Sequence, residues 1–599
     1  MVKDPHSFAR PAEARLTHVA IDLTVDFDAR TLRGCVTLDL DLAPGLTAAS
    51  REVVLDSRAL TIQSVCDVSG SALVHALREE DTLLGSALVV TLPPGVNRIV
   101  VTYATSPDGG ALQWLGPEQT AGGQHPFLFT QGHAIQSRSW LPVQDSPGIR
   151  MTYEARITVP RPLIALMSAE RAEPVSMGSQ SVFTFQMREP IPAYLIALAV
   201  GEVTCREIGA RTAVFAEPRT LDRAAYEFAE IEAILEAAEA LVGRYRWGRF
   251  DVLVMPPSFP YGGMENPRLT FVSPTLLAGD RSLVTVLVHE LAHAWAGNLV
   301  VNSTWNDFWL NEGTTVYLEL RLNEALWGAD RAALLKSWSF RELASEIERG
   351  GATPDTRLRY DMTGRDPAEG VTVIPYLKGA ALFWTLEGLV GRDRLDASLR
   401  SWFDSHAFGA VTTDMMIEHL RTTLGDGVGS LAVDLEAWVD KPGLPDVPAP
   451  TSSILDRVDA AVAAVLDRVD PSDVDVAGFT PAAWRQFLGG LRTADSDALD
   501  GLMLERLDRA FAFGASQNAE VLAPWLRLLI KASVESAGPT IEAFLRTHGR
   551  AKFLRPIVQD LLATEWGASL ARRVYESQRP RYHALVRASL DKLFETPRG

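Results

Sequence analysis

The stretch His289-Glu290-Leu291-Ala292-His293 decides how this 599-residue sequence is interpreted. Histidines four residues apart lie on one face of a helix, one turn apart, so both imidazoles can reach the same ion. The surrounding segment, 283–296, is apolar on nearly every side, and ionisable groups there are costly unless they are paired or bind a metal. The pattern predicts a buried helix that binds a metal ion, with a hydrogen-bonded pair of buried histidines as the alternative.

A third metal ligand is expected after this helix. The segment Trp309-Leu310-Asn311-Glu312-Gly313 supplies a carboxylate, and eighteen residues separate His293 from Glu312, which lets a second helix return beside the first. Two histidines and one carboxylate leave one tetrahedral position for water, which is the pattern of a catalytic zinc site. The sequence therefore predicts one Zn²⁺ per chain, bound by His289, His293 and Glu312.

Two further glutamates have predicted roles beside these ligands. A zinc of this kind lowers the pKa of its water and polarises a carbonyl. Glu290, next to His289 in the sequence, can then take the water proton and pass it to the leaving amine. Glu319 lies seven residues after Glu312, on the same helix face, where it could orient a ligand histidine or form a plain surface salt bridge.

A glycine-rich stretch, Tyr261-Gly262-Gly263-Met264-Glu265, lies just before the first motif. Its glycines allow close approach of the backbone to a ligand, and the Glu265 carboxylate could hold the ammonium group of a peptide N-terminus. The enzyme would then be an exopeptidase. Taken alone, the same stretch is also typical of an ordinary glycine-rich turn.

Composition describes a globular protein and narrows its partners. Hydrophobic residues make up 47% of the chain and charged residues 22%, close to the globular average, which argues against a collagen-like, coiled-coil or largely disordered chain. The net charge of −18 is a poor match for nucleic acid or an anionic membrane. No run of about eighteen apolar residues occurs, so no membrane-spanning helix is expected.

The cysteines and the first residues bear on where the protein works. Cys35, Cys66 and Cys205 are far apart and odd in number, so neither a disulfide framework nor a thiolate metal site is expected. The first residues contain no apolar stretch like that of a signal peptide. We therefore expect a cytoplasmic protein, with a monomer favoured, although a trimmed export signal would leave no trace.

Periodicity divides the chain into three domains. Apolar residues alternate over 19–27 and again over 36–42, as in an antiparallel sheet with one buried face. From about residue 226 the period becomes helical, and four prolines between 441 and 450 form a stiff linker. The predicted domains are an N-terminal β-sheet domain over 1–205, a mostly helical domain over 206–446 and an all-helical domain of paired helices over 447–599.

Taken together, the motifs resemble those of a known family. Gly-Gly-Met-Glu-Asn at 262–266, His-Glu-x-x-His, and Asn-Glu-Gly at 311–313 are similar to the signature of the aminopeptidase N / leukotriene A(4) hydrolase family of zinc metallopeptidases. The stretch from Pro256 to Glu319 resembles most the leukotriene A(4) hydrolase and aminopeptidase B branch. The resemblance covers essentially the whole chain. It implies an N-terminal β domain, a thermolysin-like catalytic domain and a C-terminal helical-repeat domain.

The resemblance also implies roles for residues around the zinc. It assigns zinc binding to His289, His293 and Glu312 and the general-base role to Glu290. Glu265, helped by Gln131, would bind the α-amine of the substrate. The other residues of the implied substrate-binding stretch are Tyr261, Gly262, Gly263 and Met264.

Three more residues match the family at a distance from the first motifs. Tyr376 resembles the family tyrosine that stabilises the oxyanion, since a phenol near zinc donates a hydrogen bond to the charge that develops there. Arg550 and Lys552 match a basic pair that binds the carboxylate end of short peptides, which would favour tripeptides. Taken without the resemblance, Tyr376 is a packed aromatic residue and the basic pair is part of a charged helix face.

The chain departs from this branch near Tyr376. Leukotriene A(4) hydrolase has an Asp and a Tyr there, linked to its epoxide chemistry, and alignment on Tyr376 gives Ala368 and Val371 instead. The same Asp is tied to a preference for N-terminal arginine. Glu369 lies one position out of register, and His133 replaces a glutamine near the amine site. These departures argue against epoxide hydrolysis and against that preference.

Three functions remain to be compared. We predict a zinc aminopeptidase that removes N-terminal residues from short peptides, such as dipeptides, tripeptides and aminoacyl arylamides. The first alternative is a bifunctional lipid epoxide hydrolase and aminopeptidase. The second is a non-catalytic binding scaffold, which is disfavoured because such scaffolds are expected to lose ligands or the base, whereas this chain has them all.

Overall fold

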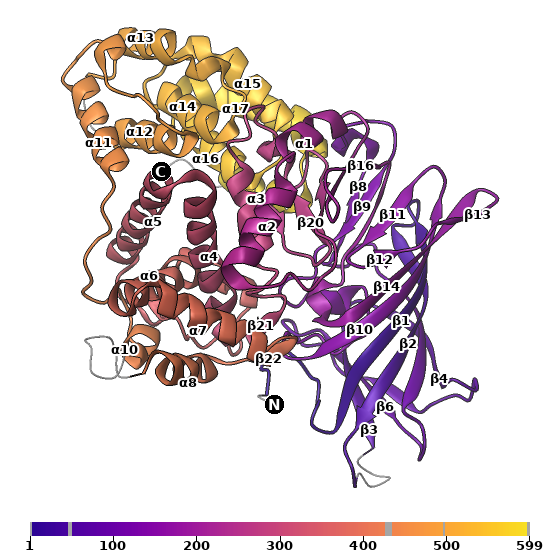
Figure 1. The fold of residues 1–599 in the computed structure, drawn as a ribbon. Helices are drawn as coiled ribbons and strands as arrows, with labels where there is room; N and C mark the ends of the chain where they lie inside the picture. The colour runs from indigo at the N-terminus through magenta and orange to yellow at the C-terminus, as the bar shows by residue number, and fades with distance from the viewer. Residues whose placement is uncertain (1–2, 46–50, 426–433, 495–497, 596–599) are drawn as a thin grey trace.

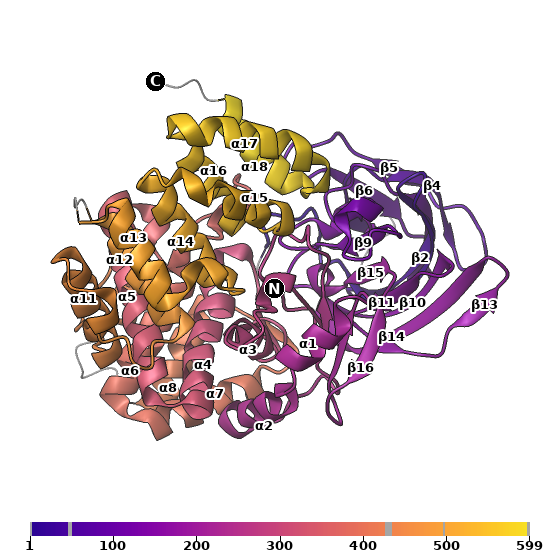
Figure 2. The ribbon, with the colours of Figure 1, turned by 90° about the horizontal axis from the view of Figure 1, so that it is seen from above.

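The computed structural model describes residues 3–45, 51–425, 434–494 and 498–595. Three regions follow one another along the chain: β-sheets, then a mixed region rich in helices, then helices alone (Figure 1). This is the order that the sequence predicts. The helical C-terminal region lies above the central region, and the β-sheets lie beside both (Figures 1 and 2).

The N-terminal region is built on one large sheet and two smaller ones. The large sheet has the order β12-β14-β10-β1-β2-β7-β4, with β13 also paired to β14. Its strands are β1 (Ala14–Asp26), β2 (Thr31–Leu42), β4 (Thr61–Asp67), β7 (Arg98–Ala104), β10 (Arg150–Pro160), β12 (Glu170–Arg171), β13 (Val175–Met177) and β14 (Gln180–Pro192). The smaller sheets are β3 (Glu52–Ser57), β6 (Ser86–Thr91) and β5 (His75–Leu77), and β11 (Ile164–Met167), β15 (Leu198–Gly201), β9 (Phe127–Thr130) and β8 (Leu112–Leu115).

One pair in the large sheet differs from the expected antiparallel arrangement. Strands β1 and β2 are antiparallel, as their alternating pattern predicts, but β1 pairs with β10 in parallel. More than a hundred residues separate β1 from β10, so the connection is long enough for the parallel crossover that a short hairpin cannot make. The other ladders of this sheet are antiparallel.

The central region joins a five-stranded sheet to a bundle of helices. The sheet has the order β16 (Thr204–Glu207), β17 (Ala213–Ala216), β18 (Asp251–Val254), β20 (Leu269–Val272) and β19 (Gly263–Met264). The helices are α1 (Leu221–Glu227), α2 (Ile231–Val242), α3 (Val284–Ala292), α4 (Trp309–Trp327), α5 (Ala329–Gly350), α6 (Gly379–Val390), α7 (Arg392–Ser405), α8 (Thr413–Leu424) and α10 (Leu435–Asp440), with a short parallel pair of β21 (Val300–Asn302) and β22 (Gly409–Val411). Strands β17 and β20 are buried on both faces, so they show no alternation by which the sequence could reveal them.

The C-terminal region stacks its helices in series. Helix α14 packs between α12 and α16, and α16 packs against α17 and α18. The helices are α11 (Ser453–Leu466), α12 (Pro481–Thr493), α13 (Gly501–Phe511), α14 (Ala519–Lys531), α15 (Gly538–Thr547), α16 (Ala551–Leu562), α17 (Glu565–Gln578) and α18 (Ala584–Glu595). The expected helical-repeat domain is confirmed.

The predicted domain boundaries, the cysteines and the question of a membrane-spanning helix can be compared with this fold. The boundary near 205 falls within β16, and the one near 446 falls between α10 and α11; both boundaries stay predictions. Cys35, Cys66 and Cys205 are free thiols. Among the described residues, no helix combines the length and the apolar character that crossing a bilayer requires.

Two glycines set the distance between helix α4 and helix α6. A Cβ atom at Gly313 would lie 2.6 Å from Cα of Gly379 and 2.8 Å from the carbonyl oxygen of Pro375. A Cβ atom at Gly379 would in turn lie 2.8 Å from Cα of Gly313. Because the obstacles are backbone atoms, neither position tolerates a side chain without moving a helix. The contact brings the π-helical turn Ile374–Lys378 against the start of α4.

We predict that Gly379→Ala destabilises the protein by about 1–3 kcal/mol, because the added methyl group meets the backbone of α4. The control is Gly388→Ala in the same helix, where an added Cβ meets no atom within 4 Å. Alanine at an exposed helical position is better than glycine by about 1 kcal/mol, so this variant should be as stable as the parent or more so. Thermal unfolding of the three proteins checks this; equal loss in both variants would contradict the contact.

Candidate metal centre and substrate site

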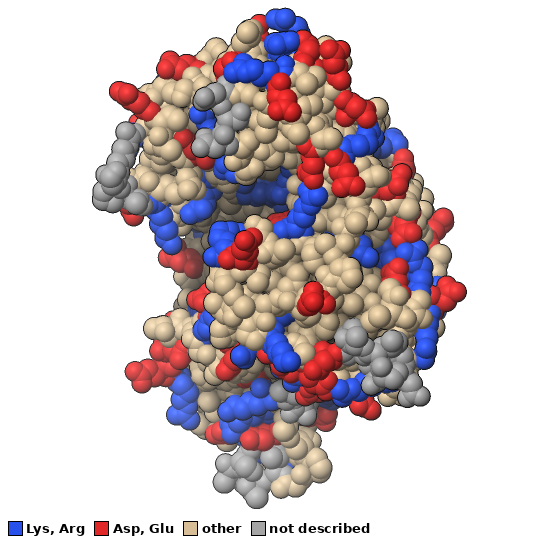
Figure 3. Space-filling model, turned by 90° about the vertical axis from the view of Figure 1, so that its left-hand side faces the viewer, with Lys and Arg blue, Asp and Glu red and all other residues tan. Residues whose placement is uncertain are grey.

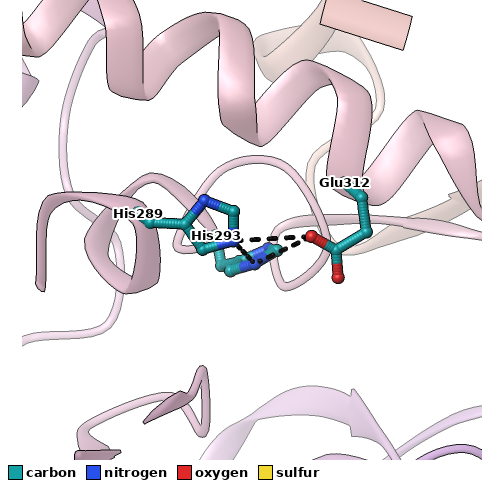
Figure 4. Close-up of side chains that lie close together, drawn as sticks. All are labelled: His289, His293 and Glu312. Carbon is teal, nitrogen blue, oxygen red and sulfur yellow. Dashed lines mark hydrogen bonds and ion pairs between the residues drawn. The ribbon is translucent and has the colours of Figure 1, made fainter. Parts of the chain in front are cut away.

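Two imidazoles face each other at the end of helix α3. His289 lies in the last turn of the helix, and His293 follows its last residue with helical backbone angles, so the four-residue spacing brings both rings to one side. Their Nε2 atoms are 3.1 Å apart. Figure 4 shows that both rings lie next to the carboxylate of Glu312, which comes from the neighbouring helix.

Glu312 enters the group from the first turn of α4. Its Oε2 atom lies 3.5 Å from Nε2 of His289 and 3.5 Å from Nε2 of His293. Glu312 and His293 are buried, yet the Oε2 atom has no hydrogen-bond partner. The three donor atoms form a cluster of the size that holds a metal ion.

The opposite nitrogens of the two rings indicate what the cluster binds. Nδ1 of His289 is 3.0 Å from a carboxylate oxygen of Glu319, and Nδ1 of His293 is 3.0 Å from the carbonyl oxygen of Ala296. Because both oxygens only accept hydrogen bonds, each Nδ1 donates its proton, and with a metal bound each ring would present an Nε2 lone pair to the ion. Two lone pairs and an unpartnered carboxylate oxygen repel one another unless a cation lies between them. The donor set fits Zn²⁺, which binds nitrogen and oxygen ligands of this kind.

Glu290 points from α3 towards the glycine-rich strand β19. The side chain is buried, and a Cβ atom at Gly263 would overlap its carboxylate. Burial, together with the neighbouring Glu265 and Glu312 carboxylates, raises the pKa of Glu290 to about 8 in spite of the opposing effect of His289. The sequence suggested that Gly263 lets the backbone approach a ligand. In the structure Gly263 makes room for the Glu290 side chain instead.

Glu265 and Glu290 form an acidic pocket beside the metal ligands. Their carboxylate oxygens and a ring nitrogen of His293 lie within 4.8 Å of one another, and all three residues are buried. Gln131 lies next to this pocket, with its amide nitrogen 3.2 Å from Sδ of Met264. The buried Oε1 atom of Gln131 has no hydrogen-bond partner. The Glu265 side chain and the free amide oxygen of Gln131 are well suited to an ammonium group.

A wall of aromatic side chains near this pocket was not found by sequence reasoning. The ring of His133 packs edge-to-face on Trp305 and Tyr194, with centroids 4.7 Å and 5.7 Å away. Burial lowers the pKa of His133, so its ring is neutral. Burial and the nearby Glu265 carboxylate raise the pKa of Tyr194 well above its ordinary value, and its buried hydroxyl has no hydrogen-bond partner. No local motif marks Tyr194, which reaches the site only through the packing of the β domain.

Tyr376 lies in the π-helical turn against the start of α4. Its ring is nearly parallel to that of His289, with centroids 6.4 Å apart and planes at 13°. Burial and the neighbouring Glu312 and Glu265 carboxylates raise the pKa of Tyr376 well above its ordinary value. The phenol therefore keeps its proton at neutral pH and can donate a hydrogen bond into the site.

Arg550 and Lys552 approach from the C-terminal region. Arg550 precedes helix α16, and a Cβ atom at Gly262 would lie only 2.5 Å from its Nη2 atom, so the guanidinium packs directly over the glycine-rich stretch. Next to Gly262, Tyr261 packs edge-to-face on Phe259. Nζ of Lys552 donates to a carboxylate oxygen of Glu520 at 2.6 Å, and burial lowers the pKa of Lys552 to about 8.

The positions shortly before Tyr376 that depart from the family pattern lie at the surface. Ala368 and Val371 are exposed. Glu369 is also exposed and lies 3.3 Å from Nε of Arg365, so its carboxylate has a partner outside the site. Among the predicted site residues, the metal ligands, Glu290, Glu265, Gln131 and Tyr376 converge, while Lys552 lies further out with Glu520.

Three family domains match the chain in order. The peptidase M1 N-terminal domain matches residues 15–195, the peptidase family M1 domain matches residues 226–438, and the C-terminal domain of leukotriene A4 hydrolase matches residues 479–594. Together they span the β-sheet, central and C-terminal helical regions of the fold.

Full-length relatives agree with these matches. The chain is 38% identical over 578 residues to leukotriene A-4 hydrolase of Xenopus laevis, covering 93% of each protein. It is 34% identical over 616 residues to leucine aminopeptidase 2 of Yarrowia lipolytica, covering 98% of this chain and 93% of the relative. The fold is similar to that of yeast LTA4 hydrolase in complex with bestatin, with a TM-score of 0.92 and 30% identity over 99% of this chain and 98% of the other.

The similarity runs through all three domains, and the cluster of His289, His293 and Glu312 has the donor set that a zinc ion requires. On this evidence the chain belongs to the M1 family of zinc metallopeptidases.

Proposed function

We propose that this protein is a zinc aminopeptidase that removes the N-terminal residue from short peptides. The observation that carries the proposal is the acidic pocket of Glu265 and Glu290 beside His293. A zinc site alone would suit cleavage anywhere in a peptide, whereas a second buried carboxylate next to it favours a substrate that ends in an ammonium group. The similarity to leucine aminopeptidase 2 supports the same activity.

We assign zinc binding to His289, His293 and Glu312, with Glu319 and the Ala296 carbonyl holding the two rings in the correct tautomer. When bound, the ion would supply a Lewis acid that polarises the scissile carbonyl and activates water. The Glu290 carboxylate would take a proton from the attacking water and pass it to the leaving amine.

The remaining residues would bind and orient the peptide. The carboxylate of Glu265 and the free Oε1 atom of Gln131 would accept hydrogen bonds from the α-ammonium group. The Tyr376 hydroxyl would donate a hydrogen bond to the carbonyl oxygen as negative charge develops on it. The stretch 261–264 would lie along the substrate backbone. Arg550 and Lys552 would bind the carboxylate at the far end of a tripeptide.

The site favours this activity over the alternatives. Epoxide hydrolysis of the leukotriene A(4) hydrolase type would call for an acid and a phenol where Ala368 and Val371 occur, and Glu369 is paired with Arg365 outside the site. A non-catalytic scaffold does not require a buried general base. In this chain Glu290 is buried, and its side chain fits only because residue 263 is a glycine. We further infer that the protein is a cytoplasmic monomer. The free cysteines support the cytoplasmic location, since disulfides are rare in that compartment.

Metal removal and a base variant test the metal chemistry. A chelator should abolish turnover of alanine p-nitroanilide, and added Zn²⁺ should restore it. Glu290→Gln should keep one zinc per chain but lose about 10²–10⁴-fold in kcat, because the proton acceptor is gone. Elemental analysis and initial rates are the measurements, with exposed Glu418→Gln as the control. Near-normal turnover by Glu290→Gln would refute the general-base role.

The acidic pocket predicts a requirement for a free amine. Alanine p-nitroanilide should be hydrolysed and its N-acetylated form should not, since acetylation removes the charge that Glu265 binds. Glu265→Gln should lower kcat/KM for the free-amine substrate by about 10-fold to 100-fold, the range for a buried charge-assisted hydrogen bond. Exposed Glu173→Gln is the control. Equal hydrolysis of the two substrates would exclude an exopeptidase.

The basic pair predicts a preference for substrates with a nearby carboxylate. Alanine p-nitroanilide has no carboxylate, so it serves as the reference substrate. Lys552→Met should lower kcat/KM for Ala-Ala-Ala, relative to kcat/KM for alanine p-nitroanilide, by about tenfold. Initial rates for both substrates give the ratio, and Lys531→Met is the control, because Lys531 donates to the backbone carbonyls of Arg492 and Ala494. An unchanged ratio would show that Lys552 does not contact the peptide.

A further inference from the structure

A small cavity lies between the central region and the C-terminal helices. It has a volume of about 190 Å³ and lies between α3, α4 and α5 on one side and α12, α14 and α16 on the other. Glu319, which bonds to His289, lies in its wall. The other charged residues of the wall are Arg331, Arg485, Glu520 and Lys552. Figure 3, which views the molecule from the left-hand side of Figure 1, shows Lys and Arg side chains gathered inside a hollow in the upper half of the molecule.

Three cations surround a single carboxylate at the outer end of this cavity. The Glu520 carboxylate is 2.6 Å from Lys552, 3.5 Å from Arg485 and 3.9 Å from Arg550. With the rest of the wall counted, two carboxylates (Glu319 and Glu520) face four cations (Arg331, Arg485, Arg550 and Lys552), so two positive charges are in excess in a protein whose net charge is −18. Like charges at such distances inside a protein repel one another, and an anion in the cavity would remove that repulsion.

Arg485 is held in position but has free donors. Its guanidinium lies over the ring of Trp338, 4.3 Å from the centroid, and its separation from Glu520 is too long for a normal hydrogen bond. Within the described part of the chain its guanidinium donates no hydrogen bond, so its planar set of N–H groups can bind a carboxylate in the bidentate way that Arg favours.

Arg331 faces the same cavity from the opposite domain. It lies on α5 seven residues before Trp338, on the same helix face. Its guanidinium is 4.3 Å from the ring centroid of Trp327, and it has no ion pair within the described residues. Arg331 and Arg485 therefore flank this cavity. Each lies over a tryptophan ring and lacks a strong hydrogen-bonding partner.

We propose that Arg485, with Arg331 opposite, forms an outer anion subsite that selects tripeptides whose C-terminal residue is Asp or Glu. This inference rests on the proposed aminopeptidase function. Arg550 and Lys552 take the terminal α-carboxylate, and the acidic side chain takes the second, outer position. A C-terminal Glu supplies two negative charges, which match the two positive charges that Glu319 and Glu520 leave uncompensated.

The test compares two tripeptides that differ only in charge, Ala-Ala-Glu and Ala-Ala-Gln. In the native enzyme kcat/KM should be about tenfold higher for Ala-Ala-Glu, the size of one charge-assisted hydrogen-bonded contact, and the ratio should fall as salt is raised to 0.5 M. Arg485→Met should bring the ratio close to one, Arg485→Lys should keep part of it, and Arg331→Met should lower it. The matched control is Arg341→Met, also on α5, since Arg341 is exposed and pairs with Asp459; its ratio should equal that of the native enzyme.

The outcomes separate this inference from the function on which it rests. Failure to cleave alanine p-nitroanilide would overturn the aminopeptidase assignment itself. Cleavage of the arylamide with a native ratio of one, or with the same ratio in Arg485→Met as in the native enzyme, would overturn the outer subsite alone. Should Arg485→Met prove unfolded by thermal melting, the native ratio, its salt dependence and the Arg485→Lys ratio still decide the matter.

Discussion

The site depends on one electrostatic constraint, which is that three donor atoms converge on a space that only a cation can fill. Nε2 of His289 and Nε2 of His293 are 3.1 Å apart, and each lies 3.5 Å from the same oxygen of Glu312. The second nitrogen of each ring is already satisfied, by Glu319 and by the Ala296 carbonyl, so neither ring can turn away at no cost. Helices α3 and α4 thus form their contact in the core around a set of donors that fits a zinc ion, and the elements that supply the other groups are arranged about it.

Glycines fix the distances over which those elements approach. Gly313 and Gly379 let the turn that carries Tyr376 lie against the first turn of α4, next to Glu312. Gly263 leaves room for the Glu290 carboxylate, and Gly262 does the same for Arg550. In each case the glycine of a motif is needed for packing between protein groups, which is a more specific role than the approach of backbone to ligand that the sequence suggested.

Charge is distributed along the site in a way that matches a peptide with free ends. The acidic pocket of Glu265 and Glu290 lies at the metal, and the cations around Glu520 lie at the outer cavity. A zwitterionic peptide would meet opposite charge at both ends. The net charge of −18 describes the whole surface and conceals this local reversal, because a sum over the chain contains no information on position.

The sequence alone was sufficient to predict the metal-binding motif, the order of a β, a mixed and a helical region, and the family. These are local properties: a helix repeats every 3.6 residues, a strand every two, and the spacing of His289 and His293 places both on one helix face whatever the rest of the chain does. Only the tertiary structure decided that β1 pairs in parallel with β10, that Tyr194 reaches the metal site, and that Arg331 and Arg485 flank one cavity with Lys552. These contacts join segments that are far apart in the chain, and no local period or motif encodes them, because they arise from how whole domains pack against one another.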